Sequence, residues 1–157
     1  MLKFGNSYLK FGNDFILNWF KDKLNPLDLP PYTIRLKYKD GITPTFNKGT
    51  GVQVSESPNI WDLTYVNNDW SRLLYIHRDL LEVLGANATG VTNMSWMLSD
   101  CDSLTSISLF DTSSVTDMSG MFRYCSLLAF VPLFDTINVT DINNMFSRNF
   151  NYICTII

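Results

Sequence analysis

The sequence predicts an α/β repeat fold, in which residues 67–157 form a solenoid behind an N-terminal β-rich cap and anchor. Two observations predict it. One is an internal repeat with a fixed step of 24 residues, a step typical of solenoid proteins. The other is a change of apolar spacing inside each unit, from a helical period to an alternating one.

The repeat is clearest after residue 90, where Val91, Val115 and Val139 each begin a unit with Val-Thr. The same step of 24 residues relates further, mostly apolar positions in successive units: Met94, Met118 and Ile142; Met97, Met121 and Met145; Leu98, Phe122 and Phe146; Cys101, Cys125 and Asn149; Leu104, Leu128 and Tyr152. We therefore divide the solenoid into a degenerate unit 67–90, full units 91–114 and 115–138, and a partial unit 139–157.

Within one unit, Met118, Met121, Phe122 and Cys125 follow the i, i+3, i+4, i+7 spacing of a helix face. Thr116 precedes this run in the position of an N-cap. The unit then reads L-x-x-V-x-L to Leu133, and its end alternates as a strand does. Each repeat is thus predicted to be a short helix plus a short parallel strand.

The unit 67–90 matches the others only in spacing. Trp70, Leu73, Leu74 and His77 occupy the positions of Met94, Met97, Leu98 and Cys101. One unit offers too little apolar surface to offset its own ordering, so neighbouring units must stack, and the end unit must be atypical to shield the terminal rung.

Residues 1–31 are predicted to be a β-hairpin anchor and linker. Leu2-Lys3-Phe4-Gly5-Asn6 recurs at residues 9–13, and Gly-Asn pairs favour turns between short strands. A third apolar run, Phe15-Ile16-Leu17, follows. The prolines at 26, 30 and 31 then mark the linker.

Residues 32–66 are predicted to form the β-rich cap. Residues 33–39 alternate strictly, and Asp40-Gly41 is a turn signal. The alternation directs three side chains to a core, those of Ile34, Leu36 and Tyr38. It directs three others to water, those of Arg35, Lys37 and Lys39. Residues 46–58 are polar and Gly-rich, which indicates a loop with one short strand at 52–54.

The repeats resemble a known family. L-T-S-I-S-L at residues 104–109, Cys-x-x-Leu before each strand, and V-T-D-M-S-G-M-F at residues 115–122 are similar to BspA-like leucine-rich repeats of bacterial surface proteins and phage proteins. The resemblance covers residues 67–157. It implies a leucine-rich-repeat-like solenoid with a parallel sheet on one face, and an adhesive or structural role.

Composition restricts the function. The net charge is −3 and there is no basic run, so nucleic-acid binding is not expected. No apolar run is long enough for a membrane span. Met1-Leu2-Lys3 is not followed by an apolar signal-peptide core, which favours a virion protein over an exported one.

No catalytic motif is present, so no enzyme activity, cofactor or metal is expected. His77 occupies a repeat position normally held by Cys and is interpreted as structural. Cys101 and Cys125 are expected to be buried, reduced thiols, and Cys154 to be more accessible. Asp111 and Asp135 recur because their turn recurs; each turn offers one carboxylate, too few for calcium.

We therefore expect a non-enzymatic structural or recognition protein, with a bacteriophage virion component as the leading hypothesis and a fragment of a bacterial surface adhesin as the alternative. Its partners would be other virion or surface proteins, or a second copy of itself. If Ile107, Leu109, Val131 and Leu133 point inward, the open face of the sheet carries Ser106, Ser108, Phe110, Phe130, Pro132 and Phe134. Phe110 and Phe134 have the alternative of turning inward at the strand ends.

The last residues give a second candidate interface. The sequence stops inside the final predicted strand, and a strand edge with unpaired N–H and C=O groups is a template for pairing with another chain. This predicted edge-strand interface consists of Tyr152, Ile153, Thr155, Ile156 and Ile157.

Overall fold

A computed structural model describes residues 3–4, 7–8 and 29–149. At the N-terminus, β1 (Lys3–Phe4) pairs antiparallel with β2 (Ser7–Tyr8), with Lys3 opposite Tyr8. This is the arrangement expected from the Gly-Asn turn signal between them. The third predicted run, residues 15–17, lies outside the described residues.

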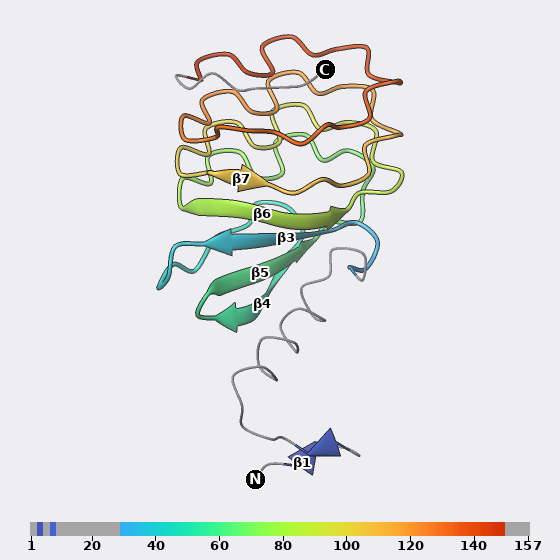
Figure 1. Ribbon diagram of the computed structural model, residues 1–157. Helices are drawn as coiled ribbons and strands as arrows, with labels where there is room; N and C mark the ends of the chain where they lie inside the picture. Colours follow the sequence, from blue (N-terminus) through green and yellow to red (C-terminus); the bar gives the residue numbers. More distant parts are fainter. Residues whose placement is uncertain (1–2, 5–6, 9–28, 150–157) are drawn as a thin grey trace.

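The main sheet has five strands in the order β4-β5-β3-β6-β7 (Figure 1). They are β3 (Thr33–Tyr38), β4 (Thr50–Glu56), β5 (Asn59–Thr64), β6 (Leu80–Asn87) and β7 (Ser106–Ile107). The β3–β5, β3–β6 and β4–β5 pairs are antiparallel, and β6–β7 is parallel. The sheet thus changes from antiparallel to parallel at β6, where the 24-residue coils begin.

β3 is the central strand, and its predicted inward residues Ile34, Leu36 and Tyr38 are buried. The prediction that Arg35 faces water is wrong. Its side chain is 8% exposed and makes two 2.7 Å hydrogen bonds to the carboxylate of Asp62 on β5. A central strand has neighbours on both sides, so a long cation on it finds a cross-strand partner rather than open solvent.

From residue 67 onward the chain winds into stacked coils of 24 residues, the first of which contains β6. Each coil contains an eight-residue segment, here called the turn segment; the four turn segments are residues 69–76, 93–100, 117–124 and 141–148. Isolated parallel bridges join their first residues, Asp69 to Asn93, Asn93 to Asp117 and Asp117 to Asp141. Figure 1 shows the coils above β7 lying one on another.

In the first three turn segments, the amides of the second, fourth, sixth and eighth residues all donate to the following coil. The amides of Trp70, Arg72, Leu74 and Ile76 donate to the carbonyls of the next coil, at Asn93, Ser95, Met97 and Ser99, over 2.8–3.0 Å. The pattern recurs from 93–100 to 117–124, and from 117–124 to 141–148. Alternate N–H groups therefore bind the following coil, and the intervening ones close local turns.

The predicted fold class is wrong, because the described residues contain no helix and the turn segments are not helical. Their fourth and eighth residues have left-handed backbones, with φ between 55° and 66°: Arg72, Ile76, Trp96, Asp100, Gly120, Tyr124, Asn144 and Arg148. A left-handed residue at every fourth position interrupts the i to i−4 bonding that an α-helix requires.

The helical spacing nevertheless identified the inward side chains. Between the left-handed residues the chain makes i to i+3 turns, such as the Met97 amide to the Met94 carbonyl at 3.2 Å. These turns direct side chains much as one helical turn does. Met94, Met97, Leu98 and Cys101 are accordingly fully buried.

The expectation of one strand per repeat is met only in the first two units. Units 67–90 and 91–114 carry β6 and the two-residue β7, whereas no strand occurs in the described residues of the units 115–138 and 139–157. Phenylalanines hold the coils together instead. The rings of Phe110 and Phe134 lie 5.0 Å apart, and Phe122 stacks on Phe134 and Phe146 at 6.3 and 5.7 Å. Burial of such rings is the largest apolar contribution available to a coil.

Candidate interaction surface

The face of the molecule that carries β6 and β7 continues over the next coil as residues 128–134 (Figure 1). Ile107 and Val131 point inward, as predicted, but Leu109 and Leu133 do not; they are 59% and 66% exposed. Because β7 ends at Ile107, strict alternation ends there too. The chain then bends and turns Phe110 and Phe134 inward, at 7% and 9% exposure.

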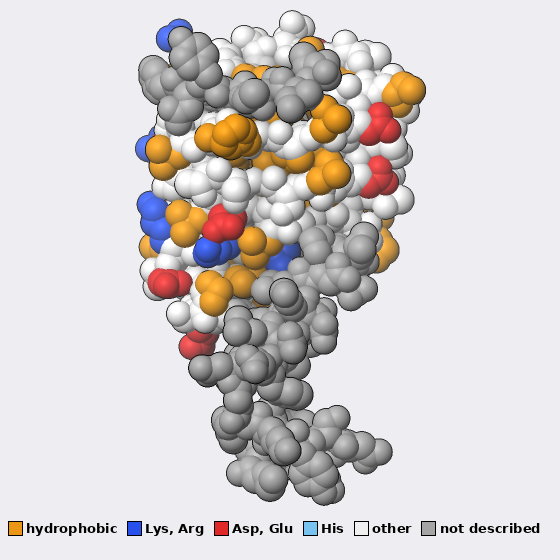
Figure 2. All heavy atoms as spheres, in the orientation of Figure 1, with side chains coloured by type: hydrophobic (Ala, Val, Ile, Leu, Met, Phe, Trp, Pro, Cys, Tyr) orange, Lys and Arg blue, Asp and Glu red, His pale blue; other side chains and the backbone are white. Residues whose placement is uncertain are grey.

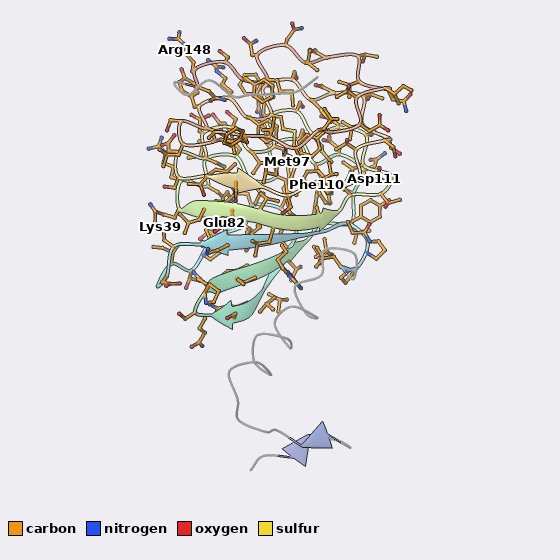
Figure 3. All side chains as sticks on the ribbon, viewed as in Figure 1. Lys39, Glu82, Met97, Phe110, Asp111 and Arg148 are labelled. Atoms are coloured by element: carbon orange, nitrogen blue, oxygen red, sulfur yellow. The ribbon has the colours of Figure 1, made fainter. Side chains whose placement is uncertain are left out.

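The six residues predicted for the open face therefore fall into three groups. Ser106 and Phe130 are exposed, Ser108 and Pro132 are half-buried, and Phe110 and Phe134 are buried. The two phenylalanines thus adopt the inward alternative. Figure 3 labels Phe110, which comes from this face, beside Met97 of the interior.

Exposed apolar side chains recur on this face from one coil to the next. We call this group the apolar ladder and define it as Leu109, Leu127, Phe130, Pro132 and Leu133. Leu109 and Leu133 occupy the same position in successive coils, and Phe130 follows Ser106 in the same way. Figure 2 shows apolar side chains gathered over the upper part of this face. Four of the five are more than half exposed.

Sequence reasoning missed Leu109 and Leu133 as surface residues. The available signal was the repeated Leu-Phe-Asp-Thr at residues 109–112 and 133–136, where two adjacent apolar residues cannot both point inward in an extended chain. The larger residue took the interior, since a buried phenylalanine removes more apolar area from water than a leucine does.

A groove of about 470 Å³ adjoins the ladder. Pro132 and Leu133 of the ladder form part of its wall, and its remaining lining is mostly apolar: Val131, Phe134, Thr136, Val139, Thr140, Ile142, Met145 and Phe146. The ladder and the groove are therefore continuous through Pro132 and Leu133. An apolar side chain or ring is the group that such a lining accommodates.

Two carboxylates border the ladder, those of Asp111 and Asp135. Each caps a turn, since Oδ1 of Asp111 accepts the Ser113 amide at 2.9 Å and Oδ1 of Asp135 accepts the Ile137 amide at 3.0 Å. Hydrogen bonds from Ser113 hold the pKa of the Asp111 carboxyl below its usual value, so it is ionised at neutral pH. Figure 3 places Asp111 at the margin of this face.

A second hollow lies at the other end of the stack, between the loop 42–47 and residues 75–79, with a volume of about 470 Å³. In it, the Tyr38 hydroxyl and His77 Nδ1 lie 2.6 Å apart, and Phe46 stacks on the imidazole at 5.6 Å. Burial lowers the pKa of His77 and raises that of Tyr38. A neutral, stacked histidine bonded to a neutral phenol has the properties of a packing element.

The cysteines behave as structural groups. Cys101 and Cys125 are fully buried, unpaired thiols whose sulfurs lie 3.2 and 3.1 Å from the carbonyl oxygens of Leu74 and Leu98. Burial raises the pKa of Cys125 to about 12 and that of Cys101 well above its usual value. Such thiols are poor nucleophiles. Cys154 lies outside the described residues, as does the whole predicted edge-strand interface of Tyr152, Ile153, Thr155, Ile156 and Ile157.

Across residues 29–149, no cluster of three or more His, Cys, Asp or Glu side chains is placed to hold a metal ion. No helix long and apolar enough to cross a membrane was found in the described part of the chain. The candidate surface is therefore the apolar ladder with its groove and its bordering carboxylates.

Comparison with known families finds a match, over residues 52–155, to a family described as Mycoplasma protein of unknown function, DUF285. The match begins within β4 and extends into the last repeat unit, which is more than half of the chain. No curated protein and no solved structure matches the chain significantly.

Proposed function

We propose that this chain, which belongs to the DUF285 family, is a non-enzymatic recognition protein that binds another protein through the apolar ladder. The observation that carries the proposal is the exposure of Leu109, Phe130 and Leu133 on one face, at 59%, 69% and 66%. Contiguous exposed apolar groups next to a groove are typical of interaction sites, whereas scattered ones are common on any protein.

The fold itself gains little free energy from the ladder residues. A leucine or phenylalanine fully removed from water contributes roughly 1.5–3 kcal/mol. The ladder residues leave most of that contribution unused in the isolated chain, because the interior positions of the same coils are already filled by Phe110 and Phe134. A partner that covers the ladder would recover it.

The cellular context of the proposal has two versions. The leading one places the protein in a bacteriophage virion, and the alternative places it on a bacterial cell surface as a BspA-like adhesin. The description of the matched family as Mycoplasma proteins supports the bacterial version. Mass spectrometry of purified virions, run beside surface biotinylation of intact host cells, separates them by where the chain is recovered and at what copy number.

The ladder itself is tested with a double variant, Leu109→Ser/Leu133→Ser. We expect it to lose association with the isolated particles or cells while its melting temperature stays near that of the natural chain, because both side chains are exposed. The matched control is Val52→Ser/Val66→Ser, which removes two side chains of 60% and 77% exposure elsewhere. Unchanged association in the ladder variant, or equal loss in the control, would contradict the proposal.

A further inference from the structure

The proposed function does not account for the two carboxylates at the margin of the ladder. Asp111 and Asp135 occupy the same position in successive coils, and both are exposed. Like charges stacked on neighbouring rungs repel each other and lower stability. Among the described residues, neither carboxylate has an ion-pair partner.

The turn does not need the charge. Each carboxylate accepts one backbone amide through Oδ1. An asparagine oxygen does the same at the start of the turn segment 93–100, where Oδ1 of Asn93 accepts the Ser95 amide at 2.9 Å. The negative charge at both turns is therefore unexplained by local structure.

Cations are scarce in this part of the chain. Between residues 79 and 147 the sequence has a single Lys or Arg, Arg123, whose guanidinium lies over the rings of Trp96 and Tyr124. On the lower part of the same face the acids are already paired, Glu82 with Lys37 and Asp79 with Lys39. Figure 3 shows Lys39 and Glu82 on the side of the face away from Asp111. The upper part thus combines apolar groups with unpaired negative charge.

From this combination we infer that the ladder binds a cationic, amphipathic polypeptide segment of another protein. Its apolar side chains cover Leu109, Phe130 and Leu133, one of them reaching the groove, and its Lys or Arg side chains meet Asp111 and Asp135. Charge complementarity excludes a second copy placed ladder to ladder, because four carboxylates would then face one another. This inference rests on the proposed function and adds the chemistry of the partner.

The test uses the full chain and three synthetic peptides of equal length, one of Leu and Lys with an amphipathic pattern, one of Leu and Glu with the same pattern, and one of Lys alone. Binding is followed by isothermal titration calorimetry. We expect the Leu/Lys peptide to bind best and its affinity to fall about tenfold or more in Leu109→Ser/Leu133→Ser. Asp111→Asn/Asp135→Asn should lower it too, and the effect of that charge change should shrink in high salt, as it does for exposed charges.

Controls separate the site from the general acidity of the chain. Glu56→Gln and Val52→Ser change an exposed charge and an exposed apolar side chain on β4 and should leave the affinity unchanged. If the Leu/Glu peptide binds as tightly as the Leu/Lys peptide, and Leu109→Ser/Leu133→Ser abolishes the binding of both, the cationic partner is ruled out and the proposed function stands. If the peptides bind equally well to Leu109→Ser/Leu133→Ser and to the natural chain, the cationic partner and the proposed function are both ruled out. Ladder-dependent binding to anionic phospholipid vesicles instead of the peptides would replace the protein partner with a lipid surface.

Discussion

The two ends of the coil stack differ in how their backbone groups are satisfied. At the N-terminal end, the Ser71 carbonyl, which faces away from the next coil, accepts Lys48 Nζ at 2.6 Å. The Trp70 indole N–H donates to the Tyr65 carbonyl at 3.2 Å. Residues of the cap thus close the first turn segment.

At the other end, the backbone amides of the last turn segment, 141–148, have no carbonyl acceptors from a following coil among the described residues. Four amides correspond in the repeat to those that bind the next coil, and none has an acceptor among the described residues: Ile142, Asn144, Phe146 and Arg148. In the side chain of Asn149, the amide oxygen and nitrogen are both buried without a hydrogen-bond partner among the described residues. At these alternate positions of the turn segments, the N–H groups are therefore directed away from the cap. The amides of Thr92, Thr116 and Thr140 donate in the opposite direction, to the preceding coil.

The largest expected effect of this difference is on proline tolerance. The Met118 amide donates to the Asp141 carbonyl at 2.8 Å, whereas the amide of Ile142, at the same repeat position, has no acceptor among the described residues. Relative to alanine at the same site, proline at 118 should lower the free energy of unfolding by about 3 kcal/mol, and proline at 142 should change it little. Urea denaturation of the four variants measures both differences, and a similar cost at 142 would contradict the open end.

Side-chain truncation should show the same gradient. Met97 is fully buried between coils, and Met145, at the same repeat position, is half-buried. We expect Met97→Ala to cost about 2–5 kcal/mol and Met145→Ala clearly less, since only the first leaves an enclosed cavity. Thermal melting of the two variants compares them directly, and equal costs would show that the last coil is as well packed as the inner ones.

The third prediction concerns pH at the capped end. Burial lowers the pKa of His77 from 6.5. Above pH 6.5 the imidazole is neutral in both states; below it, the unfolded chain takes up the proton first, so stability falls as the pH decreases. His77 is the only histidine of the sequence. Unfolding midpoints at about pH 7.5 and 5.5 should differ in the natural chain and much less in His77→Gln, which keeps an acceptor for Tyr38. If the two midpoints differ as much in His77→Gln as in the natural chain, a group other than His77 causes the pH dependence.

The smallest expected effect is an increase in stability from a substitution at Ile76. Ile76 is a β-branched residue with φ of 65° and is 47% exposed. Ile76→Asn should raise stability by up to about 1 kcal/mol, because asparagine tolerates the left-handed region far better. Tyr75→Asn is the control, since Tyr75 is also exposed but does not have a left-handed backbone. If Ile76→Asn lowers the free energy of unfolding as much as Tyr75→Asn does, the backbone strain at residue 76 is negligible.

Sequence reasoning reached the repeat length and the buried positions but not the backbone. Met94, Met97 and Leu98 have the same spacing in a helix and in a run of i to i+3 turns, so periodicity could not separate the two. The separating feature was φ, and at positions 72, 96 and 144 the left-handed residues are Arg, Trp and Asn, of which only Asn favours that region. Tertiary hydrogen bonds between coils, which no single unit contains, fix those conformations.

The candidate surface was predictable in part for a similar reason. Phe130 was predicted to face outward because the strand pattern turned its neighbour Val131 inward, and it is 69% exposed. Leu109 and Leu133 were wrongly predicted to point inward, because the alternating pattern was assumed to continue beyond Ile107, where β7 ends. The pairing of Arg35 with Asp62 depended on strand order, which the sequence does not reveal.

The direction of hydrogen bonding in the turn segments is measured by residue-resolved amide hydrogen exchange. We predict slow exchange for the inter-coil donors Met94, Leu98, Met118 and Phe122, and fast exchange for their counterparts Ile142 and Phe146. Uniform protection of all residues of a turn segment, including those whose amides make only local contacts, would indicate helical bonding. Protection of Ile142 and Phe146 equal to that of Met118 and Phe122 would contradict an open end.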